Sequence, residues 1–256
     1  MDLQLTGKRA VVTGGSRGIG LATARVLAAE GTRVALVARD EEALRGAAAQ
    51  LPGGGATIAV CDTGDPEQVT AMAERITGEL GGVDILVNSA AQANTGPMSD
   101  DQLDAQINVK VKGYLRCARA FAPGMAQRGW GRIINVSGLA ARSTGSVVGS
   151  VRNVAVAAMT KNLADEYGAA GVNVTVVHPG TTRTESLPET LARIAEAQGT
   201  TPSDVEAAIA GAVTIRRIVD AAEVADVIAF LASPRSVAVT GDAIAVGGGL
   251  RGPIYY

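Results

Sequence analysis

The clearest chemical signal in the chain is the glycine-rich stretch TGGSRGIG at 13–20. It follows a short apolar run typical of a buried strand, and it leads into a helical pattern at 18–31. Its glycines would allow a tight turn and a close approach of the backbone to a pyrophosphate, which the free N–H groups and dipole of the helix would face. The stretch therefore predicts a dinucleotide site, the alternative being an ordinary strand-to-helix turn. The expected contacts are Gly14, Ser16, Arg17, Gly18, Ile19 and Gly20.

The end of the second predicted strand bears on the choice of cofactor. There the sequence VALVARDEE places Arg39 directly after the strand, and Arg17 stands inside the glycine loop. Two guanidinium groups suit a 2′-phosphate, whereas an acid at the strand end would accept hydrogen bonds from ribose hydroxyls. The alternative is a solvated Arg39 beside Asp40 as a helix cap. We favour NADP(H) over NAD(H).

A second stretch is informative for what it lacks. Residues 137–161 read SGLAARSTGSVVGSVRNVAVAAMTK, and before Lys161 they contain no Tyr, His, Cys, Asp, Glu or Lys. The polar groups there are hydroxyls, Arg142, Arg152 and Asn153. Arginine does not readily release a proton at neutral pH, so a site built here would lack an ordinary proton donor.

Alternating strand-like and helix-like segments must position these groups. The predicted strands are 9–14, 33–38, 56–61, 83–89, 132–137, 172–177 and 242–247. The predicted helices are 18–31, 40–51 with Asp40 as cap, 65–80 opened by Asp65 and Pro66, one long helix within 100–128, about 152–168, two short helices within 186–215, and 221–233. The near-continuous Val, Ile and Leu runs of the strands favour a parallel sheet with helices on both faces. No change of composition suggests a linker, so we expect one domain.

Composition excludes several classes of function. The 256 residues are 47% hydrophobic and 19% charged, with a net charge of −2, and the basic residues are scattered. No footprint for nucleic acid or for a membrane surface is visible. Cys61 and Cys117 lie in apolar surroundings and are expected to be buried thiols rather than a disulfide or metal ligands. With no leader-like or membrane-spanning run, we expect a soluble cytoplasmic protein that acts on a small molecule.

Several motifs in order along nearly the whole chain resemble the short-chain dehydrogenase/reductase family. Besides the glycine loop, the matching segments are Asp62 after the third strand, NSAA at 88–91, GWGRIINVSG at 129–138, PGTTRT at 179–184 and TGDAIAVGGGL at 240–250, with Ala91 and Gly247 where glycine and aspartate are usual. The resemblance implies a single-domain, Rossmann-type, doubly wound α/β fold of about seven strands, and often a homotetramer. It also implies cofactor contacts at Asp62, Asn88, Ala90, Pro179, Gly180 and Thr184.

The catalytic tetrad of that family, Asn, Ser, Tyr and Lys, has no evident counterpart. Lys110 in VKVKGYL stands at the asparagine position, and Gly138 stands at the serine position with Ser137 one place early. The Tyr-x-x-x-Lys pair falls on Gly149 and Asn153 if the chain is aligned from downstream, or on Val151 and Ala155 if it is aligned from upstream. In the family the tyrosine gives a proton to a carbonyl while hydride arrives from the nicotinamide, so we expect ordinary ketone reduction to be slow here.

Lys110 is the weak candidate for a replacement catalytic group, because a desolvated lysine beside a cationic nicotinamide could have a lowered pKa. The alternative is a lysine that reaches solvent or fills space. Tyr114, one turn further, is expected to pack in the core. We discount Ser137 because successive strand residues point in opposite directions.

Three further residues are candidates for substrate binding. Arg152 could bind a substrate carboxylate or the ribose-phosphate face of the cofactor, or it could be a surface residue. Asn153 lies beside it, and His178 stands at the carboxyl end of the sixth strand, where it could instead pack beneath the loop. The segment 181–215 is expected to act as a substrate lid.

Two classes of function therefore stay open. The first is an NADP(H)-dependent oxidoreductase whose catalytic site is rebuilt around other residues, with Lys110 as the candidate, acting on an unknown carbonyl, alcohol or activated substrate. The second is a non-catalytic protein that binds or senses NADP(H), or a scaffold that serves as an inactive partner in a mixed oligomer. A weaker third possibility is loss of cofactor binding.

Overall fold

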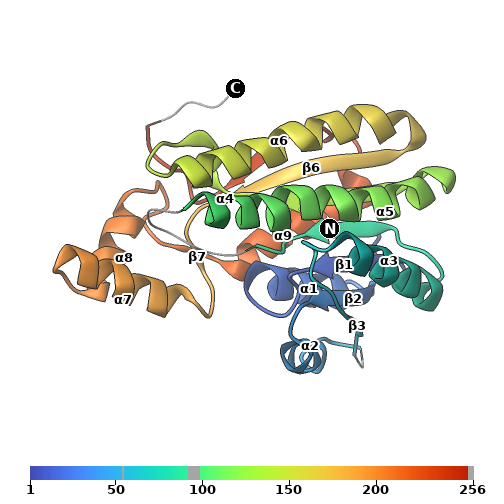
Figure 1. The fold of residues 1–256 in the computed structure, drawn as a ribbon, viewed down its shortest axis with the longest axis horizontal. Helices are drawn as coiled ribbons and strands as arrows, with labels where there is room; N and C mark the ends of the chain where they lie inside the picture. Colours follow the sequence, from blue (N-terminus) through green and yellow to red (C-terminus); the bar gives the residue numbers. More distant parts are fainter. Residues whose placement is uncertain (54, 92–98, 253–256) are drawn as a thin grey trace.

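The structure, a computed structural model, describes residues 1–53, 55–91 and 99–252. Its centre is a parallel sheet of seven strands in the order β3-β2-β1-β4-β5-β6-β9 (Figure 1). The strands are β1 (Arg9–Thr13), β2 (Arg33–Ala38), β3 (Thr57–Val60), β4 (Ile85–Asn88), β5 (Gly131–Val136), β6 (Val172–Pro179) and β9 (Ala243–Val246). The predicted single-domain, doubly wound α/β fold is confirmed. The order of the strands reverses between β1 and β4, which is where ligands bind in sheets of this kind.

Helices cover both faces of the sheet. The α-helices of the described residues are α1 (Gly18–Ala29), α2 (Glu41–Ala48), α3 (Pro66–Leu80), α4 (Asp100–Gln106), α5 (Gly113–Gln127), α6 (Val147–Tyr167), α7 (Leu187–Gln198), α8 (Pro202–Gly211) and α9 (Ala221–Ala232). One apolar cluster joins the sheet to α1, α2 and α9, and another joins it to α3, α5 and α6. Because both faces are buried, the central strands carry apolar residues at nearly every position.

Local capping chemistry starts two helices where the sequence predicts. The Asp40 carboxylate accepts a hydrogen bond from the Ala43 amide at 3.0 Å. The Asp65 carboxylate accepts from the amides of Glu67 and Gln68 at 2.9 and 3.2 Å. Each cap satisfies amide groups that the first turn of a helix leaves free.

The start of α6 differs from the prediction. The helix was expected from about 152, but it begins at Val147 with the Ser146 hydroxyl accepting from the Gly149 amide at 3.0 Å. The first turn contains two valines and a glycine, which are weak helix formers. The sequence around Ser146 therefore does not look like the start of a helix. The longer helix brings 147–151 into the element beside the candidate site.

The predicted long helix within 100–128 is divided into three parts. Between α4 and α5 the segment Ile107–Lys112 forms a π-helix. Such wider turns are uncommon and occur often at functional sites. The sequence gives no signal for it, and the buried residue of this segment is Lys110.

Between β6 and α9 the chain forms the two predicted short helices, α7 and α8, which pack on each other through a small apolar cluster and project to one side of the molecule (Figure 1). Two short parallel strands, β7 (Thr182–Arg183) and β8 (Val219–Asp220), pair with each other before α7 and after α8, and so join the two ends of this segment. This pair was not predicted, since two-residue strands carry no periodic pattern.

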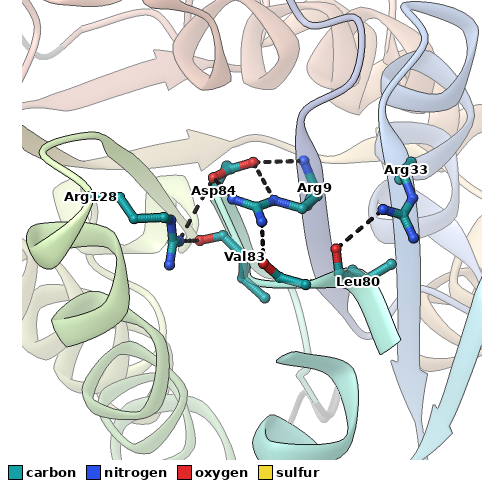
Figure 2. Close-up of polar contacts among 7 residues, drawn as sticks. Arg9, Arg33, Leu80, Val83, Asp84 and Arg128 are labelled. Carbon is teal, nitrogen blue, oxygen red and sulfur yellow. Dashed lines mark hydrogen bonds and ion pairs between the residues drawn. The ribbon is translucent and has the colours of Figure 1, made fainter. Parts of the chain in front are cut away.

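The amino-terminal edge of the sheet is held by a cluster of ion pairs (Figure 2). The Arg9 guanidinium contacts the Asp84 carboxylate at 2.6 and 2.8 Å, and Arg128 lies 3.7 Å from the same carboxylate. Burial alone would raise the pKa of Asp84, but hydrogen bonds and charge from Arg9, with the charge of Arg128, hold it below its usual value. This cluster ties β1 to the start of β4, opposite the edge where the candidate site lies.

Cys61 and Cys117 are both buried free thiols, as expected. Within the part of the chain that the structure describes, no helix is both long enough and apolar enough to cross a membrane.

Candidate functional site

One large cavity runs along the carboxyl edge of the sheet, with a volume of about 1240 Å³. Its wall contains almost all of the predicted site residues. They are Gly14, Ser16, Arg17, Gly18, Ile19, Gly20, Arg39, Asp62, Ala90, Lys110, Arg152, Asn153, Pro179, Gly180 and Thr184. Asn88 and His178 are outside this wall.

The glycine loop has the conformation that its residues permit. Gly14 and Gly18 have φ of +66° and +58°, in the left-handed region that favours glycine. A Cβ atom on Gly14 would lie 2.8 Å from the main chain of Ala90, and one on Gly20 would lie 2.2 Å from the carbonyl oxygen of Gly14. The loop is thus a close-packed turn that leads directly into α1.

An anion from the chain itself lies at the start of α1. The Glu185 carboxylate accepts a hydrogen bond from the Gly18 amide at 3.0 Å, although the two residues are 167 positions apart. The first amides of a helix attract anions through hydrogen bonding and the helix dipole. The contact shows that this helix terminus is accessible to an anion, and it connects the loop to the segment that precedes α7.

Arg17 and Arg39 are both exposed and both line the cavity at the β1–β2 side. Asp62 follows β3 at the same side, and its carboxylate accepts from the Gly64 amide at 2.8 Å. Three residues from different parts of the sequence therefore line one end of the cavity, because β1, β2 and β3 are neighbours in the sheet.

Lys110 lies at the other end, on the π-helix. Its side chain is 5% exposed, and its ammonium group donates to the Ser137 carbonyl oxygen at 3.0 Å. Burial, and then the charge of Arg152, lower its pKa to about 7. The alternative that this lysine reaches solvent is therefore wrong: it is a buried group in the cavity wall that can change its protonation near neutral pH.

Ser137 lies in the cavity wall too, although the sequence argued against it. Its hydroxyl points towards the main-chain and side-chain oxygens of Asn153, at 3.1 and 3.2 Å. A Cβ atom on Gly138 would lie 3.1 Å from the Asn153 amide nitrogen. Both residues that follow β5 therefore pack on α6, because the chain leaves the strand there and the strict alternation of side chains ends.

The structure distinguishes the two registers for α6. Asn153 is 3% exposed and lines the cavity, and Gly149 one turn earlier is buried. Val151, which the other register would place in the site, is 49% exposed on the outer side. Of the two registers, the one that pairs Gly149 with Asn153 therefore places both of its residues on the buried side of α6.

Arg152 lies beside them in the wall and donates to the side-chain oxygen of Gln106, and burial lowers its pKa. Tyr114 packs in the core, as expected. It is fully buried, its hydroxyl donates to the Val136 carbonyl at 3.0 Å, and burial raises its pKa well above the usual value.

Asn88 and His178 are buried behind the wall. The Asn88 amide donates to the Asn135 side-chain oxygen at 2.9 Å and bridges β4 to β5. His178 is 1% exposed; burial, with the charges of Arg142 and Lys110, lowers its pKa to about 4. The packed alternative for His178 is confirmed, and its position offers no direct contact with a ligand in the cavity.

Metal chemistry finds no support in the arrangement of side chains. Among the described residues no three His, Cys, Asp or Glu side chains gather in a group that could hold a metal ion. Cys61 lines the cavity, but burial raises its pKa to about 11, which keeps it a thiol and a weak nucleophile.

Comparison with known proteins settles the family. A family model described as enoyl-(acyl carrier protein) reductase matches residues 14–251. The chain is 35% identical over 254 residues to oxidoreductase UcpA of Escherichia coli (strain K12), covering 96% of this chain and 95% of that protein. The chain belongs to the short-chain dehydrogenase/reductase family.

Solved structures of this family are also similar over the whole chain. L-Sorbose reductase from Gluconobacter frateurii, complexed with NADPH and L-sorbose, has a TM-score of 0.93 and 31% identity, covering 99% of this chain and 100% of that one. An NAD⁺-bound xylitol dehydrogenase has a TM-score of 0.90 and 27% identity, covering 96% of this chain and 100% of that one. Proteins with this fold therefore include one bound to NADPH and one bound to NAD⁺.

Proposed function

We propose that this short-chain dehydrogenase/reductase binds NADP(H) and acts as an oxidoreductase on a small carbonyl, alcohol or activated substrate, without the tetrad usual in the family. The observation that carries the proposal is the single cavity that joins the glycine loop to Lys110 and Asn153. A cofactor on the loop and a substrate beside Lys110 would occupy one continuous space.

The residues of the cavity fit a dinucleotide. The glycine loop leaves no room for side chains at Gly14 and Gly20, and the Gly18 amide already holds a carboxylate where a phosphate would lie. We assign the adenosine side to Asp62, and the 2′-phosphate to Arg17 and Arg39. Further contacts are proposed for Ser16, Ile19, Ala90, Pro179, Gly180 and Thr184, and a supporting role beneath them for Asn88.

A bound nicotinamide would supply or accept the hydride. A side chain of the protein would then have to donate or accept the proton. Lys110 is the candidate, since a lysine with a pKa of about 7 can donate a proton from its ammonium form and accept one in its amine form near neutral pH. The Asn153 side chain, buried beside it, could hold a substrate oxygen by hydrogen bonding. The segment 181–215 is proposed as the lid, since its Glu185 contacts the loop directly.

A second candidate function follows from the same wall. Gly138, Gly149 and Asn153 occupy the positions where the resemblance places the serine, tyrosine and lysine of the family. A cofactor-binding or sensing protein would need the cavity but no proton donor, and a scaffold protein would need neither. Each could be a homo-oligomer of two or four chains.

Titration with NADPH and NADH, followed by fluorescence and thermal shift, tests the binding. We expect both to bind and NADPH to bind more tightly. Absence of any shift at millimolar cofactor would contradict the oxidoreductase and the cofactor-binding or sensing form of the second candidate, and would leave the scaffold form. A panel of carbonyl and enone substrates then tests turnover in the parent and in Lys110→Ala. Lower turnover in the variant supports the oxidoreductase with Lys110 as its acid, and equal rates remove Lys110 from catalysis. No turnover in the parent, with cofactor bound, supports the second candidate.

A further inference from the structure

The amine of Lys110 stands where a small molecule in the cavity can meet it. Lys110 lines the cavity wall, although it is only 5% exposed. Within the described part of the chain its nitrogen donates to one acceptor, the main-chain oxygen of Ser137 at 3.0 Å, and it forms no ion pair with a carboxylate. The nitrogen is therefore held by a neutral group and can lose its proton without breaking an ion pair.

The groups around this nitrogen favour its neutral form. Burial, followed by the charge of Arg152 on α6, lowers the pKa of Lys110 to about 7. His178 on β6 is uncharged near neutral pH, because burial and the charges of Arg142 and Lys110 lower its pKa to about 4. Tyr114 on α5 keeps its proton, since burial raises its pKa. A large share of Lys110 side chains is therefore a free amine near neutral pH, and a free lysine amine is a nucleophile for carbonyl carbon.

A donor for a carbonyl oxygen lies beside the amine. The Ser137 hydroxyl donates to the Asn153 side-chain oxygen at 3.2 Å, and both residues line the cavity. Ser137 thus contacts Lys110 through its main chain and Asn153 through its side chain. The amide nitrogen of Asn153 is left to donate to an incoming oxygen. Leu139 and Ala140 continue the same wall, and their apolar side chains suit an uncharged substituent.

We propose that the Lys110 amine captures a small uncharged aldehyde as an imine, in a reaction that needs neither hydride nor nucleotide. The nitrogen lone pair forms a bond to the carbonyl carbon while the Asn153 amide holds the oxygen. Both protons of the amine then leave with that oxygen as water, and a C=N bond remains without any change of oxidation state. An aldehyde is favoured over a ketone because the nitrogen is nearly covered and an aldehyde carbon carries one substituent fewer.

The inference goes beyond the proposed function, and it gives the same nitrogen a second role. A captured aldehyde occupies the amine, so it should block Lys110 as a proton donor. The capture can be measured without NADP(H), which separates its test from that of the proposed function.

Reductive trapping on the cofactor-free protein tests the inference. Butanal and cyanoborohydride are added near neutral pH, and peptide mass mapping locates each lysine that gains the mass of the aldehyde less its oxygen. We expect Lys110 to be modified about tenfold or more faster than Lys112, the exposed lysine of the same π-helix, because ordinary lysines are almost wholly ammonium there. In urea-unfolded protein this difference should disappear, since it comes from the folded surroundings.

Two variants refine the test, and circular dichroism confirms that they are folded. Asn153→Ala should slow the modification of Lys110 about fivefold, as expected for the loss of one hydrogen bond, and should leave Lys112 unchanged. Lys112→Met is the matched control and should leave the rate at Lys110 as in the parent.

The decisive comparison is made within the parent protein, so it does not depend on whether a variant folds. Equal rates at Lys110 and Lys112, or absence of an adduct on Lys110, would overturn the inference. An unchanged rate in Asn153→Ala would overturn the role given to Asn153. NADPH binding without an adduct on Lys110 rejects this inference alone, whereas an adduct without NADPH binding rejects the proposed function and leaves the inference.

Discussion

Replacing Lys110 with methionine should stabilise the protein at neutral pH and change how its stability depends on pH. In the unfolded chain the lysine keeps its ordinary pKa of 10.5, whereas in the folded protein that pKa is about 7. Between these values the unfolded state binds more protons than the folded state. The free energy of unfolding of the parent should therefore rise with pH across that window.

The size of the effect follows from the difference between the two pKa values. Each pKa unit corresponds to about 1.4 kcal/mol, so the contribution of Lys110 to stability should improve by about 4 kcal/mol from pH 7 to pH 10.5. Methionine has a similar length and does not titrate. It leaves the Ser137 carbonyl without this donor, which costs about 1 kcal/mol at every pH.

Urea unfolding of parent and variant at a series of pH values measures this difference. We expect the variant to be more stable than the parent near pH 7 and to lose that advantage towards pH 10.5. Other titrating groups are common to both proteins and cancel in the comparison. The variant Lys112→Met, from the same π-helix, controls for the loss of a lysine. Parallel stability curves for parent and Lys110→Met would refute the account of a buried, desolvated ammonium.

Three further predictions concern the glycine loop and the opposite edge of the sheet. Gly20→Ala should lower the free energy of unfolding by about 1–3 kcal/mol because its Cβ atom would meet a carbonyl oxygen, whereas Gly78→Ala, with open space around it in α3, should raise it by about 0.5–1 kcal/mol in urea unfolding. Glu185→Gln should tighten NADPH binding about two- to fivefold in a fluorescence titration, because the carboxylate no longer competes for the Gly18 amide. Asp84→Asn should cost about 3 kcal/mol near neutral pH. The lowered pKa of Asp84 means that this cost fades as the pH falls below the usual aspartate value, which urea unfolding across acidic pH would reveal.

Each of these has a result that contradicts it. Equal effects of the two glycine substitutions would show that the loop is not close-packed. Unchanged or weaker NADPH binding in Glu185→Gln would show that the carboxylate does not compete. A cost for Asp84→Asn that stays constant into acid would show that the charge of Asp84 is not what stabilises the edge.

Local signals explain why most of the fold could be predicted. Asp40 and Asp65 cap their helices by accepting hydrogen bonds from amides no more than three residues later, so the helix starts are visible in the sequence. Buried parallel strands appear as apolar runs. The glycine loop carries its own conformational requirement. These features are decided by neighbours in the sequence, so the order of elements and the glycine loop in the cavity wall follow from it.

The end of the cavity around Lys110 could not be predicted in the same way. The direction of Lys110 depends on the π-helix, and the direction of Ser137 depends on how the chain leaves β5. The contact between Glu185 and Gly18 joins positions 167 residues apart. Such contacts follow from tertiary packing, and no short pattern encodes them.

The structure of the protein with NADPH bound tests the central claim most directly. The account predicts the pyrophosphate on the Gly18 amide with the Glu185 carboxylate displaced, the 2′-phosphate beside Arg17 and Arg39, and the nicotinamide ring facing Lys110. A nucleotide bound elsewhere, or a nicotinamide ring directed away from Lys110, would contradict it.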